Sequence, residues 1–347
     1  TAVQPGVRIR SVLTSSTTLS GNDIIWADVG PENGAGSLSE LQPVRAGAAP
    51  LTVTFISSAG AVASLVTQTE TNDTVTAQIA PNTANTPTAL SAGGVELDPL
   101  TAGTSDIYVE APGYVSVDTS TINITAPTIN MVNRTVGAGL QEFTSVSLGA
   151  TLAAGDTLTI VSSNPNVLLA PDGVTVGSST LRIAGPFAVA NFYIQAVEGF
   201  TGQATMTASA PGYTDGVSTA TVVQPGIRVR SVAASYGAGD ANDVIWADVG
   251  PENGNGGLLE LQPIRAGVSP LQVTFTSSDP SAATLVTQTL TGGSVTAEIV
   301  PGVANTPTQL TLGGVELDPL AAGSTTISVS ASGFLPAGSS QAVTINP

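Results

Sequence analysis

The feature that most constrains the fold is a long internal repeat. Residues 22–34 read NDIIWADVGPENG, and residues 242–254 read NDVIWADVGPENG. The same offset of 220 positions relates LQPVRAG at 41–47 to LQPIRAG at 261–267. The two copies agree without a gap at well over half of their positions. Self-similarity over such a length indicates that both ends of the chain fold into copies of one domain.

The segment between the copies is different but related. All three segments close with the same pattern, which is a turn of small residues, an aromatic residue, an alternating stretch and a proline. These features predict three domains in the order A, B, A′, at residues 1–126, 127–224 and 225–347. A further B domain would begin where the chain stops. We therefore expect a window of a longer A-B-A-B array, with a complete three-domain protein as the alternative.

Alternation of apolar and polar residues predicts strands throughout the chain. LTVTF at 51–55, LQVTF at 271–275 and DTLTIV at 156–161 are typical of half-buried antiparallel strands. Gly and Pro, 38 and 23 in number, punctuate these stretches at intervals suited to turns. The predicted fold class is all-β, with tandem immunoglobulin-like antiparallel β-sandwiches in an extended array. Residues 22–36 and 81–100 are predicted to be strand-plus-loop insertions that lengthen the A domains.

Composition excludes several classes of chemistry. The chain has no His and no Cys, and all eight of its basic residues are Arg. Hydroxyl or thiol nucleophiles activated by His, thiolate or imidazole metal sites and lysine Schiff bases are therefore excluded. A net charge of -17 argues against nucleic-acid binding, which depends on neutralising phosphates. No apolar run is long enough for membrane insertion of this segment, and we predict that the chain is not an enzyme.

A short motif carries a resemblance to a known family. Ser277, Ser278, Asp279, Pro280 and Ser281 form an SSDPS turn after an alternating stretch. The closing part of the same domain approximates the family's second motif, through Ala322, Gly323, Thr326, Ile327, Ser328, Val329, Gly333 and Phe334. These motifs resemble those of bacterial immunoglobulin-like repeats, the Big-domain group. In the first domain, SSAGAVAS at 57–64 lacks the Asp-Pro turn. The resemblance implies a tandem module of a secreted or surface-displayed bacterial protein.

Acidic and amide side chains in Gly/Pro-rich loops are candidate calcium ligands. Oxygen atoms are the ligands that Ca²⁺ prefers, although the spacing is not that of an EF-hand. The alternative is that these side chains cap turns. No cofactor is certain, and calcium is the one candidate. The candidate residues are Asp23, Asp28, Glu32, Asn33, Glu96 and Asp98, with their repeats Asp243, Asp248, Glu252, Asn253, Glu316 and Asp318.

The pair Glu96 and Asp98 alternates with apolar residues, so both carboxylates point to one face of a strand. Two carboxylates can perform glycoside hydrolysis, can bind a cation or can pair with Arg. Arg8 and Arg10 also share a strand face, and pairing with Arg is the interpretation we favour over catalysis.

Trp26 and Trp246 are the only tryptophans. An exposed Trp can stack on a sugar or anchor a neighbouring subunit, whereas the flanking Ile and Val favour a core or domain-junction position.

These observations predict a structural or adhesive extracellular or cell-surface protein, whose modules form a rod, stalk, surface layer or fibre. The predicted partners are other copies of the chain or host and cell-surface components. One alternative is a carbohydrate- or ligand-binding module. Another is an accessory region of a secreted enzyme whose catalytic domain lies outside this chain.

Overall fold

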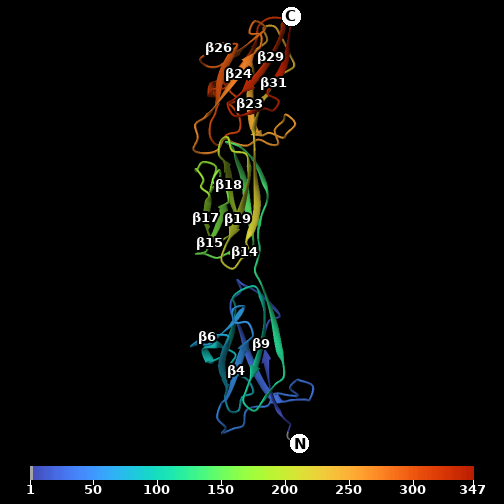
Figure 1. Cartoon of the computed structure of the whole chain (residues 1–347), viewed down its shortest axis with the longest axis vertical. Coiled ribbons are helices and arrows are strands. Elements are labelled where there is room, and N and C mark those ends of the chain that lie inside the picture. Colours follow the sequence, from blue (N-terminus) through green and yellow to red (C-terminus); the bar gives the residue numbers. More distant parts are fainter. Residues whose placement is uncertain (1–2) are drawn as a thin grey trace. The chain divides into compact units, whose positions relative to one another are not determined.

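The computed structural model describes residues 3–347 and is built almost wholly from strands. Six sheets form three sandwiches, coloured from blue through green to red in Figure 1. The chain divides into two compact units, one formed by residues up to Thr128 with Gly212–Thr214 and the other by Ile129–Pro211 with Asp215–Pro347. The predicted all-β class of tandem, largely antiparallel sandwiches is confirmed. The domain boundaries after residues 126 and 224 stay predictions.

The first sandwich lies in the first unit. One of its sheets contains, in spatial order, β10 (Val115–Ser116), β1 (Pro5–Arg10), β3 (Asp23–Pro31), β8 (Val95–Pro99), β5 (Ala63–Val66) and β6 (Thr71–Asn72). The other contains β2 (Ser15–Thr17), β11 (Thr119–Thr125), β9 (Gly103–Glu110), β4 (Leu51–Ser57) and β7 (Thr74–Ile79). A single 3-10 turn, η1 (Leu90–Ala92), precedes β8.

The third sandwich repeats this topology strand for strand. One sheet contains β26 (Thr291–Gly292), β25 (Ala283–Val286), β28 (Val315–Pro319), β23 (Asp243–Pro251), β21 (Pro225–Arg230) and β30 (Leu335–Pro336). The other contains β22 (Ser235–Gly237), β31 (Ser340–Asn346), β29 (Gly323–Ser330), β24 (Leu271–Ser277) and β27 (Ser294–Ile299), with η2 (Leu310–Leu312) before β28. The sequence repeat is therefore a structural repeat.

The second sandwich is simpler. Its four-stranded sheet contains β12 (Ile129–Met131), β14 (Gln141–Leu152), β18 (Phe187–Ala196) and β16 (Val167–Ala170). Its five-stranded sheet contains β13 (Arg134–Gly137), β20 (Gly216–Val223), β19 (Gly202–Ser209), β15 (Thr157–Ser162) and β17 (Thr180–Ala184). The second and third sandwiches belong to the same compact unit.

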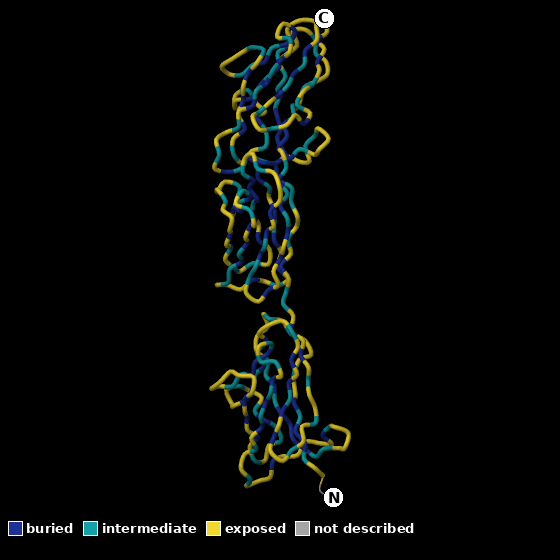
Figure 2. The backbone as a smooth tube through the Cα atoms, in the orientation of Figure 1, coloured by how far each residue is buried: buried dark blue, intermediate teal, exposed yellow. Residues whose placement is uncertain are grey.

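Alternation along each strand builds the cores. In β4 the side chains of Val53 and Phe55 are fully buried, while Thr52 between β4's apolar residues is exposed. Because successive strand residues point to opposite faces, such a strand gives one apolar face to the space between the sheets. Figure 2 shows buried backbone running through each sandwich, with exposed residues concentrated in the connecting loops.

The predicted insertion at residues 22–36 is wrong in one respect. Strand β3 (Asp23–Pro31) is a central strand, paired with β1 and β8. Its Ile25, Ala27 and Val29 are buried in the core, so this stretch is part of the sandwich itself. The added surface lies in the loop that follows β3, and in the segment before β8 that contains η1.

The SSDPS motif forms the turn that its composition predicts. The carboxylate of Asp279 accepts hydrogen bonds from the backbone N–H of Ser281 at 3.0 Å and from its hydroxyl at 2.6 Å. These hydrogen bonds hold the pKa of Asp279 below its usual value. An Asp before Pro that caps its own turn is a structural corner.

Candidate functional site: the junction between the second and third sandwiches

Gln262 is the central side chain of this junction. It belongs to the third sandwich and is fully buried, although glutamine is usually exposed. Its Oε1 accepts a hydrogen bond at 2.9 Å from the backbone N–H of Gly137 in the second sandwich. Its Nε2 donates to the carbonyl oxygen of Thr135 at 2.7 Å. Both ends of the amide are thus satisfied by the second sandwich, as a buried polar group requires.

A tight turn of the second sandwich enters the third. The turn is Gly137-Ala138-Gly139-Leu140, between β13 and β14. The side chain of Leu140 is fully buried and belongs to the apolar core of the third sandwich, where Leu140 forms a β-bridge with Ile264. A Cβ on Gly137 would lie 2.5 Å from Leu140 Cδ1 and 3.4 Å from Pro225. Any larger residue at position 137 would therefore require the buried side chain of Leu140 to shift.

A second glutamine extends the network. The backbone N–H of Gln141 donates to the carbonyl oxygen of Pro263 at 2.9 Å. The side-chain oxygen of Gln141 accepts from the backbone N–H of Ala266 at 3.2 Å and from Gln195 Nε2 at 3.1 Å. Gln141 and Gln195 are both buried. Because a buried, fully paired polar network fixes one arrangement, these contacts hold the two sandwiches in a single orientation.

Charged groups border the junction on one side. The guanidinium of Arg265 contacts both carboxylate oxygens of Glu198, at 2.9 and 2.7 Å. Burial of Glu198 raises its pKa, but the hydrogen bonds from Arg265 and from the backbone, together with the charge of Arg265, outweigh burial, so the pKa of Glu198 is lowered. The Glu198 side chain is 52% exposed. Because water reaches the carboxylate, the contribution of this ion pair to stability is small.

Glu142 lies on the other side of Gln262. Its carboxylate accepts from Gln262 Nε2 at 3.2 Å. Burial and the neighbouring charge of Glu260 raise the pKa of Glu142, against the opposing influence of Arg134 and Gln262. The charged form of Glu142 is therefore disfavoured in the folded chain.

A cavity of about 460 Å³ opens beside the same junction. Its apolar lining comes largely from the third sandwich, with Val268, Leu271 and Phe334, while Glu198 and Gly199 come from the second. The cavity is therefore continuous with the docked surfaces.

The candidate calcium ligand Asp28 is used differently from the prediction. It is 4% exposed, and its Oδ2 lies 3.2 Å from Arg8 Nη2 and 3.6 Å from Arg10 Nε. Its repeat Asp248 pairs in the same way with Arg228 and Arg230, at 3.0 and 3.6 Å. The prediction that these arginines pair with Glu96 and Asp98 is wrong. Asp28 lies opposite Arg8 on the neighbouring strand, which brings its carboxylate between both guanidinium groups.

Glu32 and Asn33 cap the loop after β3. The carboxylate of Glu32 accepts from the backbone N–H groups of Gly34 and Gly36, at 2.8 and 3.1 Å. The side-chain oxygen of Asn33 accepts from Ala35 and Ser37. Glu252 and Asn253 make the same four hydrogen bonds in the third sandwich. The turn-capping alternative thus describes their contacts in the folded chain.

The remaining candidates lie on neighbouring strands. Asp23 is paired with Leu97, which separates Glu96 from Asp98 in β8, and Glu96 accepts a hydrogen bond from Asn22 at 3.3 Å. Asp243, Glu316 and Asp318 occupy the equivalent places. Within residues 3–347 no three acidic side chains gather where they could hold one ion. Calcium binding stays a prediction, which a comparison of melting temperatures with and without chelator tests.

The two tryptophans lie on the outer face of their sheets. Trp26 is half-buried beside Arg10, its partner across the β1–β3 ladder, while its neighbours Ile25 and Ala27 point inward. Trp246 is placed in the same way, and its indole N–H donates to Asp248 at 3.1 Å. Neither lies in a core cluster.

Sequence reasoning missed Gln262, Gln141 and Leu140 as functional residues. The signal for Gln262 was present, because a polar Gln recurs inside the repeated segments LQPVRAG and LQPIRAG. Nothing in the sequence alone connects that segment with the Gly-Ala-Gly-Leu turn of another domain.

Comparisons with known proteins find likenesses among solved structures only. No family model matches the chain, and no curated protein matches it in sequence. The adhesin InvE of Yersinia pseudotuberculosis is 14% identical, over 64% of this chain and 60% of its own, with a TM-score of 0.25. Invasin, described as a bacterial integrin-binding protein, is 13% identical over 99% of this chain and 60% of its own, with a TM-score of 0.28.

The I9–I11 tandem of titin is 8% identical over 98% of each chain, with a TM-score of 0.30. The chain thus resembles immunoglobulin-like tandem proteins, bacterial adhesins among them, as its motifs predict. It spans 60% of the length of the two adhesins. Because these TM-scores are below 0.5, the likenesses carry no weight for function. The described part of the chain has no helix of the length and apolar character needed to cross a membrane.

Proposed function

We propose that the chain is a non-enzymatic, load-bearing segment of an extracellular or cell-surface protein, in which tandem sandwiches form a rod or stalk. The observation that carries the proposal is the junction between the second and third sandwiches. Leu140 fills a place in the neighbouring core, and Gln262 and Gln141 bridge the two sandwiches through buried hydrogen bonds. A joint of this kind resists bending because any rotation exposes apolar surface and breaks buried hydrogen bonds.

The surface charge suits the same role. A net charge of -17 keeps copies of the chain apart in solution and favours an extended arrangement of its modules. The chain has no Cys and only two Met, so it offers little to oxidants outside the cell.

Electron microscopy of the purified chain in negative stain tests the proposal. A rod or stalk segment gives elongated particles of sandwich-sized lobes joined end to end, at protein concentrations where the chain is monomeric. Compact particles with the lobes folded together would contradict it. Filaments of many copies would instead make the chain itself a fibre subunit.

A ligand-binding role is the second candidate, and one observation favours it. Phe143 and Tyr193 form a cross-strand pair on β14 and β18 with ring centroids 5.5 Å apart, and Phe143 is 49% exposed. Exposed aromatic rings can pack on the apolar faces of a ligand, sugars included. Binding of the chain to a panel of immobilised polysaccharides, lost in Phe143→Ser, would support this role. Equal binding by both proteins would exclude this aromatic pair.

A further inference from the structure

The first sandwich has the same docking surface as the third, but exposed. In the third sandwich, Gln262 and Ala266 are 0% and 2% exposed because the second sandwich covers them. Their counterparts Gln42 and Ala46 are both exposed. The segments that carry them, LQPVRAG and LQPIRAG, differ only at Val44 and Ile264. We call this surface of the first sandwich, formed by Val3, Pro5, Gln42, Pro43, Arg45 and Tyr114, the open seat.

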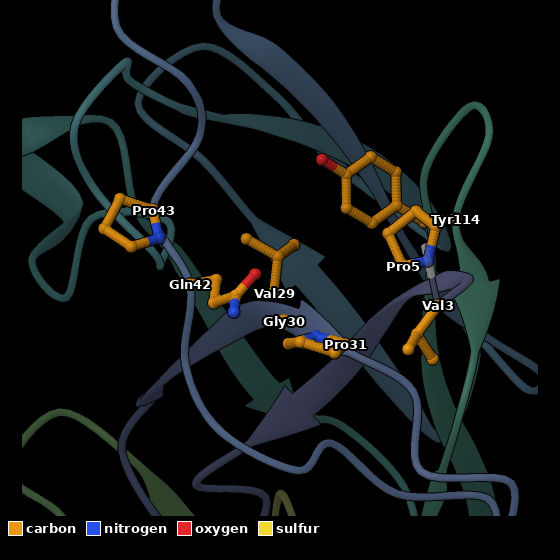
Figure 3. Close-up of a pocket in the computed structure, with 8 residues that line it drawn as sticks. All are labelled: Val3, Pro5, Val29, Gly30, Pro31, Gln42, Pro43 and Tyr114. Carbon is orange, nitrogen blue, oxygen red and sulfur yellow. The ribbon is translucent and has the colours of Figure 1, made fainter. Parts of the chain in front are cut away.

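A hollow of about 390 Å³ lies within the open seat; Val29, Gly30 and Pro31 complete its lining, and Arg45 lies outside it. Figure 3 shows Gln42 and Pro43 on one side of it, Pro5 and Tyr114 on the other, and Val29 with Gly30 between them. Its residues match those around the occupied seat almost one for one, since Val-Gln-Pro-Gly occurs at both 3–6 and 223–226.

The open seat is already in its docked shape. The backbone N–H of Gln42 donates to Val29, as that of Gln262 does to Val249, at 3.0 and 3.2 Å. Val44 donates to Thr83 at 2.9 Å, and Ile264 donates to Val303 at the same distance. Binding to a preformed surface costs less ordering entropy than binding that must reshape it.

The occupied seat shows which chemistry the open one recognises. The occupant supplies a Gly-Ala-Gly-Leu turn, with a glycine that lets the backbone approach and a leucine that fills an apolar site. It also supplies Glu198, which pairs with Arg265. The counterpart of Arg265 in the first sandwich is Arg45. The third sandwich's own turn at 237–240 reads Gly-Ala-Gly-Asp. The carboxylate of Asp240 accepts a hydrogen bond from Gly237 in its own turn, but at the place of Leu140 this charge would have to leave water for an apolar site, which disfavours that turn as an occupant.

We propose that the open seat binds another B-type sandwich, meaning a sandwich with the turn and charges of residues 127–220, in the way that the third sandwich binds the second. Gln42 then bridges to the backbone of the incoming turn, the leucine of that turn packs against Val44, and Arg45 pairs with the incoming Glu. The first and third sandwiches are thus equivalent acceptors, of which one is filled within the chain.

An extended chain tests this directly. Residues 127–220 are copied in front of the complete chain, so that Ala220 of the copy is followed by Thr1. The joint then reads TAVQP where the natural joint after Ala220 reads TVVQP. Hydrogen–deuterium exchange with peptide resolution follows the backbone amides of Arg45 and Ala46, with those of Arg265 and Ala266 as the internal reference. The latter two amides donate to Gly139 and Gln141 of the second sandwich.

In the natural chain we expect the amides at 45–46 to exchange at least about tenfold faster than those at 265–266. In the extended chain the amides at 45–46 should exchange as slowly as those at 265–266. A Gln42→Ala substitution should leave the melting temperature of the natural chain unchanged. In the extended chain it should lower the melting temperature of the first sandwich by about 4 °C, and Gln262→Ala should have an effect of the same size on the third.

The matched control is the extended chain whose copied turn carries Leu140→Asp, which should leave the amides at 45–46 exchanging fast. The copy and the original second sandwich yield peptides of identical sequence. A single isotopic envelope for these peptides, exchanging as slowly as in the natural chain, shows that the copy is folded. Fast exchange at 45–46 beside a folded, unsubstituted copy would overturn the proposal. Slow exchange at 45–46 in the natural chain would overturn it too, since the seat would then be closed already.

Discussion

Asp248 is 3% exposed, and its carboxylate lies between the guanidinium groups of Arg228 and Arg230. We expect Asp248→Ala to destabilise this sandwich by about 2–3 kcal/mol, because removing one partner leaves two unpaired guanidinium groups. The value lies below that of a wholly buried pair, since both arginines keep some contact with water.

Trp246 allows this loss to be measured separately. In a Trp26→Phe background, urea unfolding followed by fluorescence reports only on the third sandwich. Asp28→Ala, read through Trp26 with Trp246→Phe, should give a similar loss in the first. A change below about 0.5 kcal/mol at both sites would mean that the arginines find other partners.

Glu142 carries the clearest pH dependence. Because burial and Glu260 raise its pKa in the folded chain, its ionisation opposes folding. This free-energy cost is absent below the usual carboxyl pKa, where the group is protonated in both states. It grows as the pH rises toward the folded-state pKa and is complete above it. Glu142→Gln should therefore raise the melting temperature of the unit formed by the second and third sandwiches at pH 7. At pH 4 it should leave that melting temperature nearly unchanged. A variant that melts below the natural chain at pH 7 would show that the charge of Glu142 is stabilising.

At the scale of elements, Gly250 of β23 lets residues 260–266, which make the junction contacts, cross over that strand. A Cβ on Gly250 would lie 1.8 Å from the carbonyl oxygen of Glu260, so any side chain displaces residues 260–266. We expect Gly250→Ala to cost about 3 kcal/mol or more and to loosen the junction. Gly254, with φ +79° and open space around it, is the control, and Gly254→Ala should cost about 1 kcal/mol. Equal losses of unfolding free energy for Gly250→Ala and Gly254→Ala, measured in urea, would show that the close approach of Glu260 to Gly250 is not what the glycine is needed for.

Strands with regular alternation could be predicted from sequence, and β4 and β24 are the clearest cases because their buried residues recur every second position. The insertion predicted at residues 22–36 is instead the central strand β3 with its following loop. Its burial pattern becomes continuous after Ala27, because the loop that follows folds back over its outer face, and local periodicity cannot show this. The pairing of Asp28 with Arg8 and Arg10 was missed for a related reason, since it depends on the register between β1 and β3.

At the scale of the molecule, the repeat predicts that the first and third sandwiches are equivalent, and their matching sheets confirm it. The junction could not be predicted, because it joins Gly137–Gln141 to Gln262–Ala266, segments that share no pattern. Its residues are also individually ordinary, since a Gln or a Leu reveals its role only once its neighbours are placed. The load-bearing role requires that the second and third sandwiches hold one orientation.

Spin-label distance measurement across that junction is the most direct test. The chain has no native Cys, so Ser147→Cys and Thr289→Cys, both at exposed positions, can be labelled without background. We predict a single narrow distance distribution for this otherwise natural chain. It should broaden strongly when Leu140→Asp and Gln262→Ala are added. An equally broad distribution with and without the two junction substitutions would contradict a rigid joint, and with it the load-bearing role.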